Sequence, residues 1–329
     1  FAITATTPQL PAAMKVINTL REVLPDARII LGGAHATLAH TGMSEDLKRG
    51  RRGRGTMTFE QLEQSVDRIV VGDGEIADFF AIDPEYKSQV IDAGNLKSPF
   101  FLQKGTLEQF EYPARDLVDM DTYHYWIDGH RAFSEIAQLG CPFECGFCGG
   151  RDSNFLRIAR PRNSSHVVAE IEQVILEAQK RGTNYSAVMF YDDELNVVPN
   201  TLQTLCKELI DLQQRLGIEM RFRGFVKADL FTQEQAELMF RAGFRILLTG
   251  VESGSDKMLL AMKKRTSREI NSNLVRIAHS TGLKVKALMS IGHPGESAET
   301  VEESVEWVKS NLWRDWDDVD WTVITEYPG

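Results

Sequence analysis

Three of the four cysteines in this 329-residue chain, Cys141, Cys145 and Cys148, lie within eight residues. They stand in the run Leu-Gly-Cys-Pro-Phe-Glu-Cys-Gly-Phe-Cys-Gly-Gly, whose four glycines allow the backbone to turn tightly around a bound centre. A loop of this kind supplies three thiolates and leaves one coordination position open. Thiolates are soft ligands, typical of iron–sulfur clusters, zinc and copper(I). The spacing therefore indicates a small metal centre with one position free for a substrate or cofactor.

A structural zinc site, a disulfide and chance spacing are the competing interpretations. A structural zinc site has a fourth Cys or His at ligand spacing. Cys206 lies in an apolar helical pattern and is interpreted as a core residue, and His130 is a possible fourth ligand without other support. Three clustered cysteines leave one unpaired in any disulfide pattern, and we expect no secretory signal. The spacing favours the open iron–sulfur site, with zinc as the alternative.

Composition narrows the class of protein. Apolar residues make up 43% of the chain, and 47 acidic against 37 basic residues give a formal net charge of −10. This balance argues against a general nucleic-acid binder, and no apolar run approaches the roughly 18 residues of a membrane span. The basic, glycine-rich run 48–55 could bind RNA or an anionic surface, but a solvated loop is favoured. We expect a cytoplasmic protein without a membrane span and without nucleic acid as a partner.

The first hundred residues alternate between strand and helix patterns. Strands are predicted at 1–6, 27–31 and 68–71, with a helix after the first, and residues 84–130 are predicted to be a connector. Short βα units of this kind predict a parallel sheet covered by helices, with ligands bound beyond the carboxyl ends of the strands. The polar, glycine-rich segments 4–8, 32–35 and 72–75 fall at those ends. Because the chain starts and stops beside strand patterns, we expect a fragment of a longer protein.

A regular βα rhythm begins at Arg131. Strands are predicted at 131–138, 186–191, 219–226, 244–250, 284–291 and 319–325. Helices are predicted at 164–181, 200–215, 232–241, 255–262, 267–281 and 297–310. Gly217, Gly243 and Gly282 each follow a predicted helix, as glycines that end helices do. Six βα repeats predict a parallel barrel or a partial one, with its chemistry at the carboxyl ends of the strands.

Four motifs in order carry a family resemblance. The cysteine loop, Tyr-Asp-Asp-Glu at 191–194, Gly-Val-Glu-Ser-Gly at 250–254 and Lys-Val-Lys-Ala-Leu-Met-Ser-Ile-Gly-His-Pro-Gly at 284–295 resemble the core of radical S-adenosylmethionine (SAM) enzymes. Residues 1–75 resemble the later part of the cobalamin-binding domain that precedes this core in one large subgroup. The segments 4–9, 31–37 and 70–75 carry that second match. The early strands of that domain, with the place of an Asp-x-His-x-x-Gly motif, are missing, and His35 is not taken as a substitute for its histidine.

The resemblance implies an α/β architecture in two parts. A Rossmann-like, cobalamin-binding-like parallel-sheet domain, truncated at its N-terminus, is expected over 1–112, with a linker over 113–130. A radical SAM (βα)6 partial TIM barrel is expected over 131–329. The implied cofactors are a [4Fe–4S] cluster on Cys141, Cys145 and Cys148, SAM on the open iron, and cobalamin with an unidentified axial ligand.

The strand-end residues suit the parts of SAM and cobalamin. Carboxylates are suited to bind the ammonium group of SAM, and cations are suited to bind its carboxylate. Polar side chains are suited to bind the ribose hydroxyls, and flat apolar groups are suited to contact the adenine. His293 could donate a proton, although a structural role in its turn is favoured. In the order of these groups, the SAM candidates are Asp192, Asp193, Glu194; Arg223, Lys227, Lys264; Glu252, Ser253; and Phe147, Ile291, Gly292. The cobalamin candidates are Thr4, Thr6, Gly32, Gly33, Gly72 and Glu75.

The implied activity is SAM cleavage to a 5′-deoxyadenosyl radical, followed by cobalamin-dependent methylation of an unactivated carbon. A small-molecule or natural-product-type substrate and an electron donor such as flavodoxin or ferredoxin are the expected partners. A cobalamin-dependent ring contraction or cyclisation is one alternative. A methylthiotransferase-like RNA modifier is another, but it would have three further cysteines near its N-terminus and residues 1–130 contain none. A non-catalytic zinc protein is the third.

Overall fold

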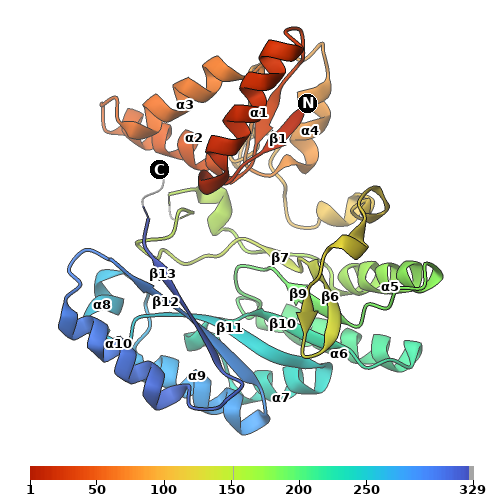
Figure 1. Cartoon of the computed structure of the whole chain (residues 1–329), viewed down its shortest axis with the longest axis vertical. Coiled ribbons are helices and arrows are strands. Elements are labelled where there is room, and N and C mark those ends of the chain that lie inside the picture. Colours follow the sequence, from red (N-terminus) through yellow and green to blue (C-terminus); the bar gives the residue numbers. More distant parts are fainter. Residues whose placement is uncertain (151, 326–329) are drawn as a thin grey trace. The chain divides into compact units, whose positions relative to one another are not determined.

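The computed structural model describes residues 1–150 and 152–325, which divide into two compact units (Figure 1). Unit 1 contains Phe1–Gln103, Phe147–Ile158 and Thr325, and unit 2 contains Lys104–Gly146 and Ala159–Ile324. The cysteine loop is therefore divided, with Cys141 and Cys145 in unit 2 and Cys148 in unit 1. The domain limits predicted from the sequence stay a prediction.

Unit 1 contains a parallel sheet of four strands in the order β1-β2-β3-β4. Neighbouring residues of β3 point to opposite faces, so that Ile69 and Val71 pack with α1, α2 and α3, whereas Val70 packs with α4. The strands are β1 (Ala2–Thr4), β2 (Ile30–Gly32), β3 (Arg68–Val71) and β4 (Val90–Asp92). The helices are α1 (Leu10–Val23), α2 (Ala34–Lys48), α3 (Arg54–Ser65) and α4 (Gly74–Ile82). The predicted parallel sheet is confirmed, whereas β4 lies where a connector was predicted.

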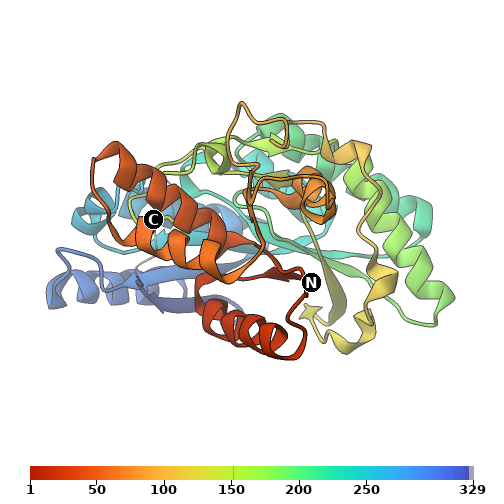
Figure 2. The ribbon, with the colours of Figure 1, turned by 90° about the horizontal axis from the view of Figure 1, so that it is seen from above.

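Helices α2 and α3 lie side by side (Figures 1 and 2). Their approach is so close that a Cβ added to Gly55 would lie 2.3 Å from the carbonyl carbon of Gly42. The basic run 48–55 forms the turn between them, and α3 begins inside it. Arg51 pairs with Asp46 at 3.2 Å and Arg52 with Glu60 at 2.5 Å, so these two cations are bound by carboxylates of the same helix pair.

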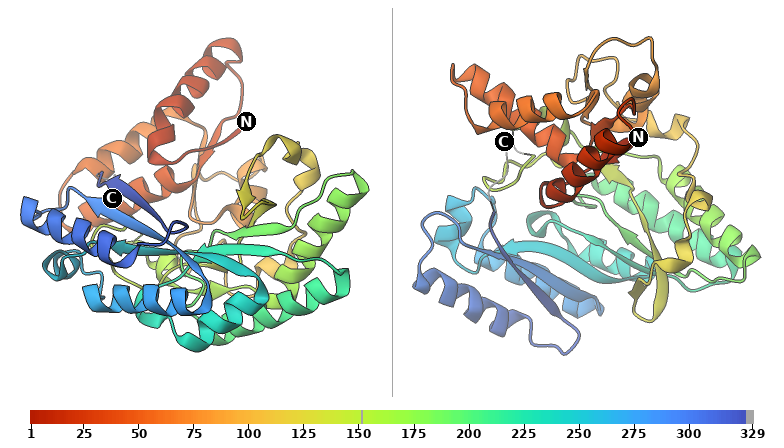
Figure 3. Two further views of the ribbon diagram at one scale, coloured as in Figure 1. Left: turned by 60° about the horizontal axis from the view of Figure 1, so that its bottom comes forward. Right: turned by 45° about the horizontal axis from the view of Figure 1, so that its top comes forward.

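Unit 2 contains a curled sheet of seven strands in the order β13-β12-β11-β10-β9-β6-β5 (Figure 3). All neighbours are parallel except β5 and β6. The strands are β5 (Trp126–Ile127), β6 (His130–Glu135), β9 (Ala187–Phe190), β10 (Arg221–Phe225), β11 (Phe244–Glu252), β12 (Lys284–Ile291) and β13 (Asp318–Val323). The helices are α5 (Ser164–Lys180), α6 (Pro199–Leu216), α7 (Gln233–Ala242), α8 (Asp256–Ala261), α9 (Arg268–Thr281) and α10 (Ala298–Asn311). The predicted partial barrel is confirmed.

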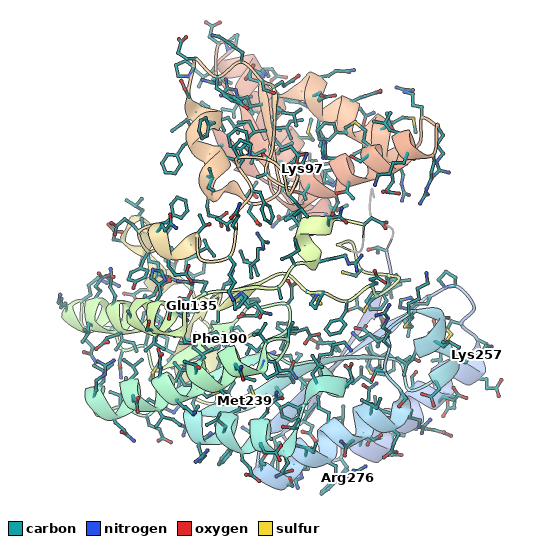
Figure 4. All side chains as sticks on the ribbon, turned by 180° about the vertical axis from the view of Figure 1, so that it is seen from behind. Lys97, Glu135, Phe190, Met239, Lys257 and Arg276 are labelled. Atoms are coloured by element: carbon teal, nitrogen blue, oxygen red, sulfur yellow. The ribbon has the colours of Figure 1, made fainter. Side chains whose placement is uncertain are left out.

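The two faces of this sheet have different surroundings. On the outer face, strand residues such as Phe190 and Phe222 pack with helix residues such as Met239, and Figure 4 shows Phe190 and Met239 inside the unit. The other face, here called the inner face, has a smaller apolar cluster of strand residues and residues beside them, without a helix residue. It consists of Ile127, Ala132, Ala187, Met189 and Leu248, with Tyr125, Phe225 and Ile246 partly buried against it.

Gly217, Gly243 and Gly282 end α6, α7 and α9 in the left-handed conformation, as predicted. At Gly243, with φ at 108°, an added Cβ would also lie 2.6 Å from the carbonyl oxygen of Met220. Within residues 1–150 and 152–325, no helix is both long and apolar enough to cross a membrane.

Candidate functional site

The cysteine loop follows the carboxyl end of β6, as predicted, and is closed at its base. The short strand β7 (Gln138–Leu139) pairs antiparallel with β8 (Arg160–Pro161). One residue further on each side, the backbone N–H of Arg162 donates to the carbonyl of Ala137 at 2.8 Å. The three cysteines therefore belong to one loop whose two ends are held together by backbone hydrogen bonds.

A cluster of two arginines and two glutamates fixes this base. Arg162 donates to Glu135 at 2.8 Å and to Glu170 at 2.6 Å, and Arg115 contacts the same two carboxylates at 3.1 and 2.5 Å. Arg162 also donates to the carbonyl of Ile136 at 2.7 Å. Both glutamates are buried. Burial, followed by the charge of Glu170, raises the pKa of Glu135 to about 7 although both arginines oppose the shift.

The cysteine thiols are free of disulfides. Cys141 and Cys145 are partly buried and Cys148 is exposed. Burial raises the pKa of Cys141 to about 11, with further contributions from Glu194 and Asp193. Across the described part of the chain, no three His, Cys, Asp or Glu side chains converge on one metal position. The residues proposed to bind a cluster are therefore identified by their donor chemistry and their place in the fold.

The two other predicted candidates for a metal ligand have different surroundings. Cys206 is buried in α6, in agreement with the prediction that it is a core residue, and burial raises its pKa to about 12. His130 lies at the start of β6, whereas the cysteine loop follows the end of that strand. The His130 Nδ1 contacts the Ser186 hydroxyl at 2.9 Å.

The three carboxyls after β9 have different environments. Asp192 is buried and accepts the backbone N–H of Ala137 at 3.1 and 3.2 Å, and burial raises its pKa to about 8. Desolvation also raises the pKa of Asp193, opposed by a hydrogen bond from the Gly140 backbone. Burial raises the pKa of Glu194 to about 7, although Lys264 and Lys227 oppose the shift. The Oε2 atom of Glu194 is buried and has no hydrogen-bond partner among the described residues.

Glu252, which is partly buried, is the centre of a chain of hydrogen-bonded polar side chains. Lys264 donates to its Oε1 at 2.9 Å, and the Ser290 hydroxyl donates to its Oε2 at 3.1 Å. Ser290 also hydrogen bonds with the Nε2 of His293 at 2.8 Å. Glu252 has a φ of 64°, and the register of β11 with β12 shifts at this point. A left-handed conformation is rare for a residue other than glycine and is concentrated at functional sites.

Charge interactions connect the polar side chains around Glu252 with the acidic segment 192–194 and with the cysteine loop. Burial acts to lower the pKa of Lys264, but the charges of Glu252, Glu194 and Cys145 raise it above its ordinary value. Glu194, Glu252 and Lys264 are thus predicted site residues that the structure places near one another. Ser290, which holds Glu252, was not singled out from the sequence, because its strand position resembles that of any buried serine.

Four further SAM candidates have their own partners. Buried Lys227 pairs with Asp229, and its Nζ lies 4.5 Å from the ring centroid of Phe143. Ser253 hydrogen bonds with Ser304 of α10 at 3.0 Å and accepts the N–H of Ser255 at 3.1 Å. Ile291 accepts the N–H of Ile324 at 2.8 Å, and Gly292 donates its N–H to Glu296 at 2.5 Å.

The remaining two SAM candidates lie inside a strand of unit 2 and in unit 1. Arg223 is the central residue of β10, and its Nη1 donates to the Tyr125 hydroxyl at 3.1 Å. Phe147 belongs to unit 1.

Unit 1 has a cavity of about 610 Å³ that lies at the carboxyl ends of β1, β2 and β3. Of the predicted cobalamin candidates, Thr6, Gly33 and Gly72 line it, whereas Thr4, Gly32 and Glu75 do not. Thr37, which the sequence did not single out, joins two of these strand ends, since its hydroxyl donates to the Gly33 carbonyl and accepts the Gly72 N–H, both at 3.0 Å. The full lining is Thr6, Thr7, Pro8, Gly33, Ala34, Thr37, Leu38, Gly72, Asp73, Gly149, Gly150, Phe155 and Leu156.

The fold and the cysteine loop define a class of protein. A family model described as the Radical SAM superfamily matches residues 136–308, more than half of the chain. The chain therefore belongs to the radical SAM superfamily, whose enzymes use a [4Fe–4S] cluster and SAM. The predicted family resemblance is thereby confirmed.

Particular relatives extend the similarity to the whole chain. It is 24% identical to an uncharacterized methyltransferase of Pyrococcus horikoshii, over 99% of this chain and 67% of that protein. It is 25% identical to the anaerobic magnesium-protoporphyrin IX monomethyl ester cyclase of Rubrivivax gelatinosus, over 99% of this chain and 56% of that protein. The chain thus spans between about half and two thirds of the length of these relatives.

A solved structure supports the fold of both units. The radical SAM methyltransferase TsrM of Kitasatospora setae matches with a TM-score of 0.70 and 19% identity, over 98% of this chain and 61% of that one. TsrM has been solved with its substrate tryptophan and a SAM analogue, and also with cobalamin and a [4Fe–4S] cluster. The match confirms the predicted α/β architecture.

Proposed function

We propose that this chain cleaves SAM to a 5′-deoxyadenosyl radical and serves as a cobalamin-dependent methyltransferase acting on an unactivated carbon. The observation that carries the proposal is the position of the three cysteines, on a closed loop at the carboxyl end of the first parallel strand of a half-barrel. In barrels of parallel strands, chemistry is located at these ends. Membership of the radical SAM superfamily supports the same assignment.

The donor set fits an iron–sulfur cluster. Cys141, Cys145 and Cys148 would hold it, because soft thiolates are the usual ligands of such clusters and none of these thiols is in a disulfide. Bound there and reduced, a [4Fe–4S] cluster supplies the electron that cleaves SAM. Asp192 would position the cysteine loop and would not contact SAM, because its buried carboxyl accepts the Ala137 N–H at the start of the loop.

The amino-acid and ribose parts of SAM fit the neighbouring residues. The partnerless Oε2 of Glu194 would accept the SAM ammonium, and Lys264 would attract the SAM carboxylate. Glu252, held by Lys264 and Ser290, would accept a ribose hydroxyl. Asp193 and Lys227 stay candidates for the amino-acid end of SAM, Ser253 for the ribose, and Phe147, Ile291 and Gly292 for the adenine.

The unit 1 cavity is the proposed cobalamin site. Ligands of parallel α/β sheets bind beyond the carboxyl ends of the strands, and this cavity lies at three of them. The backbone of Gly33 and Gly72 allows close approach, and Thr6 offers a hydroxyl. Thr4 and Gly32 end β1 and β2, and Glu75 lies in the first turn of α4. Cobalamin bound there would supply the methyl group. The cobalamin of TsrM supports this assignment.

A cobalamin-dependent cyclisation without methyl transfer is the second candidate function. The similarity to the magnesium-protoporphyrin IX monomethyl ester cyclase over 99% of the chain favours it. For either activity we propose a small-molecule or natural-product-type substrate and an electron donor of the flavodoxin or ferredoxin kind, in the cytoplasm.

The test is anaerobic reconstitution of the full chain with iron, sulfide and cobalamin, followed by a visible spectrum and a SAM-cleavage assay. Cys145→Ala is expected to lose the cluster absorbance and all 5′-deoxyadenosine formation. Cys206→Ala, a cysteine buried in α6, is the matched control and is expected to keep both. Turnover by Cys145→Ala would refute the assignment. S-adenosylhomocysteine among the products would indicate methylation, and its absence during turnover would favour cyclisation.

A further inference from the structure

We propose that the inner face of unit 2 binds an oxyanion of the substrate, a carboxylate or a phosphate on an apolar body, through the Arg223 guanidinium and the Tyr125 hydroxyl. This inference rests on the proposed function in one respect, that the bound anion is the substrate. It assigns to Arg223 a role different from that of a SAM ligand.

The alternation of β10 places Arg223 on the inner face. Phe222 belongs to the outer core, whereas Phe225, two residues beyond Arg223, packs against the inner apolar cluster. In the sheet, Arg223 is in register with Met189 of β9 and Ile246 of β11, both of which belong to that cluster or pack against it. Arg223 is therefore a cation in the middle of an apolar strand surface, two residues before the end of its strand.

Three neighbouring cations of these strands are paired with carboxylates, whereas Arg245 of β11 donates to the backbone carbonyls of Phe240 and Phe244. Lys286 contacts Asp318 and Asp320, each at 2.8 Å. Lys284 contacts Asp128 at 2.5 Å, and Arg221 contacts Glu219 at 2.7 Å. Arg223 makes no ion pair within the described chain, and its Nε is buried without a partner. The pKa of nearby Asp318 is lowered first by its hydrogen bond from Lys286, and the charge of Arg223 is the last of the contributions.

The contact between Arg223 and Tyr125 leaves hydrogen-bond donors without an acceptor. Because the guanidinium donates to the phenolic oxygen, the Tyr125 hydroxyl proton remains available to another acceptor. Burial raises the pKa of Tyr125, so the phenol keeps this proton at neutral pH. Because the phenolic oxygen already accepts from the guanidinium, the pair presents hydrogen-bond donors and a positive charge to a ligand. This combination selects an oxyanion, and charge-assisted hydrogen bonds of this kind are the strong ones.

The surroundings specify the rest of the ligand. Met189 and Leu248 are buried residues of the inner face, and no residue of a helix contributes to its apolar cluster within the described chain. An apolar body would cover this surface while its anionic group contacts Arg223 and Tyr125. The ligand class is therefore an organic anion with a sizeable apolar part.

The test compares ligands that differ in one group. We would titrate the full chain with 2-naphthoate, with its neutral counterpart 2-naphthamide and with 2-naphthyl phosphate, by isothermal titration calorimetry. The wild-type chain is expected to bind at least one of the two anions roughly 10- to 100-fold more tightly than the amide, as one charged hydrogen-bonded contact predicts. Preference for naphthoate would identify a carboxylate site, and preference for naphthyl phosphate a phosphate site. Equal affinity for all three ligands would overturn the proposal.

Variants separate this site from its alternatives. Arg223→Gln is expected to abolish the preference for the anion, and Tyr125→Phe to reduce it. Arg221→Gln, on the same strand but paired with Glu219, is the matched control and is expected to keep it. If circular dichroism shows that Arg223→Gln is misfolded, the Tyr125→Phe variant provides the test. An unchanged preference for the anion over the amide in Tyr125→Phe would then overturn the proposal.

A SAM titration of the reconstituted chain distinguishes the two roles of Arg223. Loss of SAM affinity in Arg223→Gln with an unchanged preference for the anion would assign Arg223 to SAM and overturn the proposal. Failure of the wild-type chain to cleave SAM, with the anion preference intact and dependent on Arg223, would refute only the proposed function.

Discussion

At the scale of single residues, the adjacent carboxyl groups of the acidic segment 192–194 have different surroundings and different proposed roles. The sequence predicts three acidic residues at a strand end, but it does not predict which of them is buried. In the structure, Asp192 is turned into the protein beneath Ala137, whereas Glu194 lies near Lys264. The difference depends on which backbone amides and cations surround each group, and these come from segments distant in the chain. Tyr125 was missed for the same reason, since its contact with Arg223 joins residues 98 positions apart.

Asp192 predicts a specific dependence of stability on pH. Its pKa is raised to about 8 in the folded chain, above the ordinary value that it regains on unfolding. Its contribution is therefore fully present below the unfolded pKa and is lost as pH rises through about 8. Between about pH 6 and about pH 8 this group alone should lower the free energy of unfolding by about 2 to 3 kcal/mol.

Urea unfolding at a series of pH values measures this effect. Asp192→Asn should flatten the decline, because an amide does not titrate. Asp318→Asn provides a control, since Asp318 has a lowered pKa and should leave the decline in this range unchanged. An equal slope in wild type and Asp192→Asn would contradict the assigned pKa shift.

At the scale of elements, local signals predicted unit 2 better than unit 1. The unit 2 helices have apolar faces, caps and terminal glycines that agree with one another, so their limits were predicted to within two residues. Strand β4 was missed because Val90 and Ile91 are its only apolar residues. Helix α3 was missed because it starts inside a basic, glycine-rich run, where its close contact with α2 compensates for weak local preference.

The cluster of two arginines and two glutamates at the base of the cysteine loop predicts that alanine substitutions of two arginines, one inside the cluster and one outside it, lower the free energy of unfolding by unequal amounts. Arg162→Ala would leave Glu135 and Glu170 buried with Arg115 as their remaining cation. Breaking a buried ion pair from one side costs about 3 to 5 kcal/mol of unfolding free energy. Arg215, whose side chain is 55% exposed beside Glu172, is the control, and Arg215→Ala should cost much less. Chemical denaturation of both variants is the measurement, and similar losses would contradict the role of the cluster.

At the scale of the whole molecule, the two units have separate apolar cores, and the segment 147–158 belongs to unit 1 although the sequence around it belongs to unit 2. Its contacts explain this. The Ser153 hydroxyl hydrogen bonds with Thr41 of α2 at 2.8 Å, and a Cβ added to Gly94 would lie 3.1 Å from the ring of Phe155. The sequence predicts the units through their repeating patterns, but this membership depends on contacts between distant segments and was not predicted.

Destabilising unit 1 should therefore reduce the protection of residues 147–158 from hydrogen exchange. Phe59, 1% exposed, lies in the unit 1 core, and Phe59→Ala should cost about 3 to 5 kcal/mol of unfolding free energy. Hydrogen exchange measured by mass spectrometry should then show faster exchange in peptides of 30–71 and of 147–158. Peptides of 187–250 should keep their protection. Phe222→Ala in unit 2 is the control and should produce the opposite pattern, and protection of 147–158 that follows unit 2 would contradict the division.

Because residues 147–158 belong to unit 1, they are also expected to pack at a different time from the rest of the cysteine loop during synthesis of the chain. Chains grow from the N-terminus and domains fold as units. The ribosome completes residues 1–103 before it reaches Cys148, so the surface on which residues 147–158 pack can form before those residues emerge. Cys141 and Cys145 instead belong to a unit whose last strand, β13, is added almost 180 residues later. Nascent chains arrested once residues 147–158 have left the ribosome exit tunnel, but before β13 is made, should therefore already protect Ser153 and Phe155.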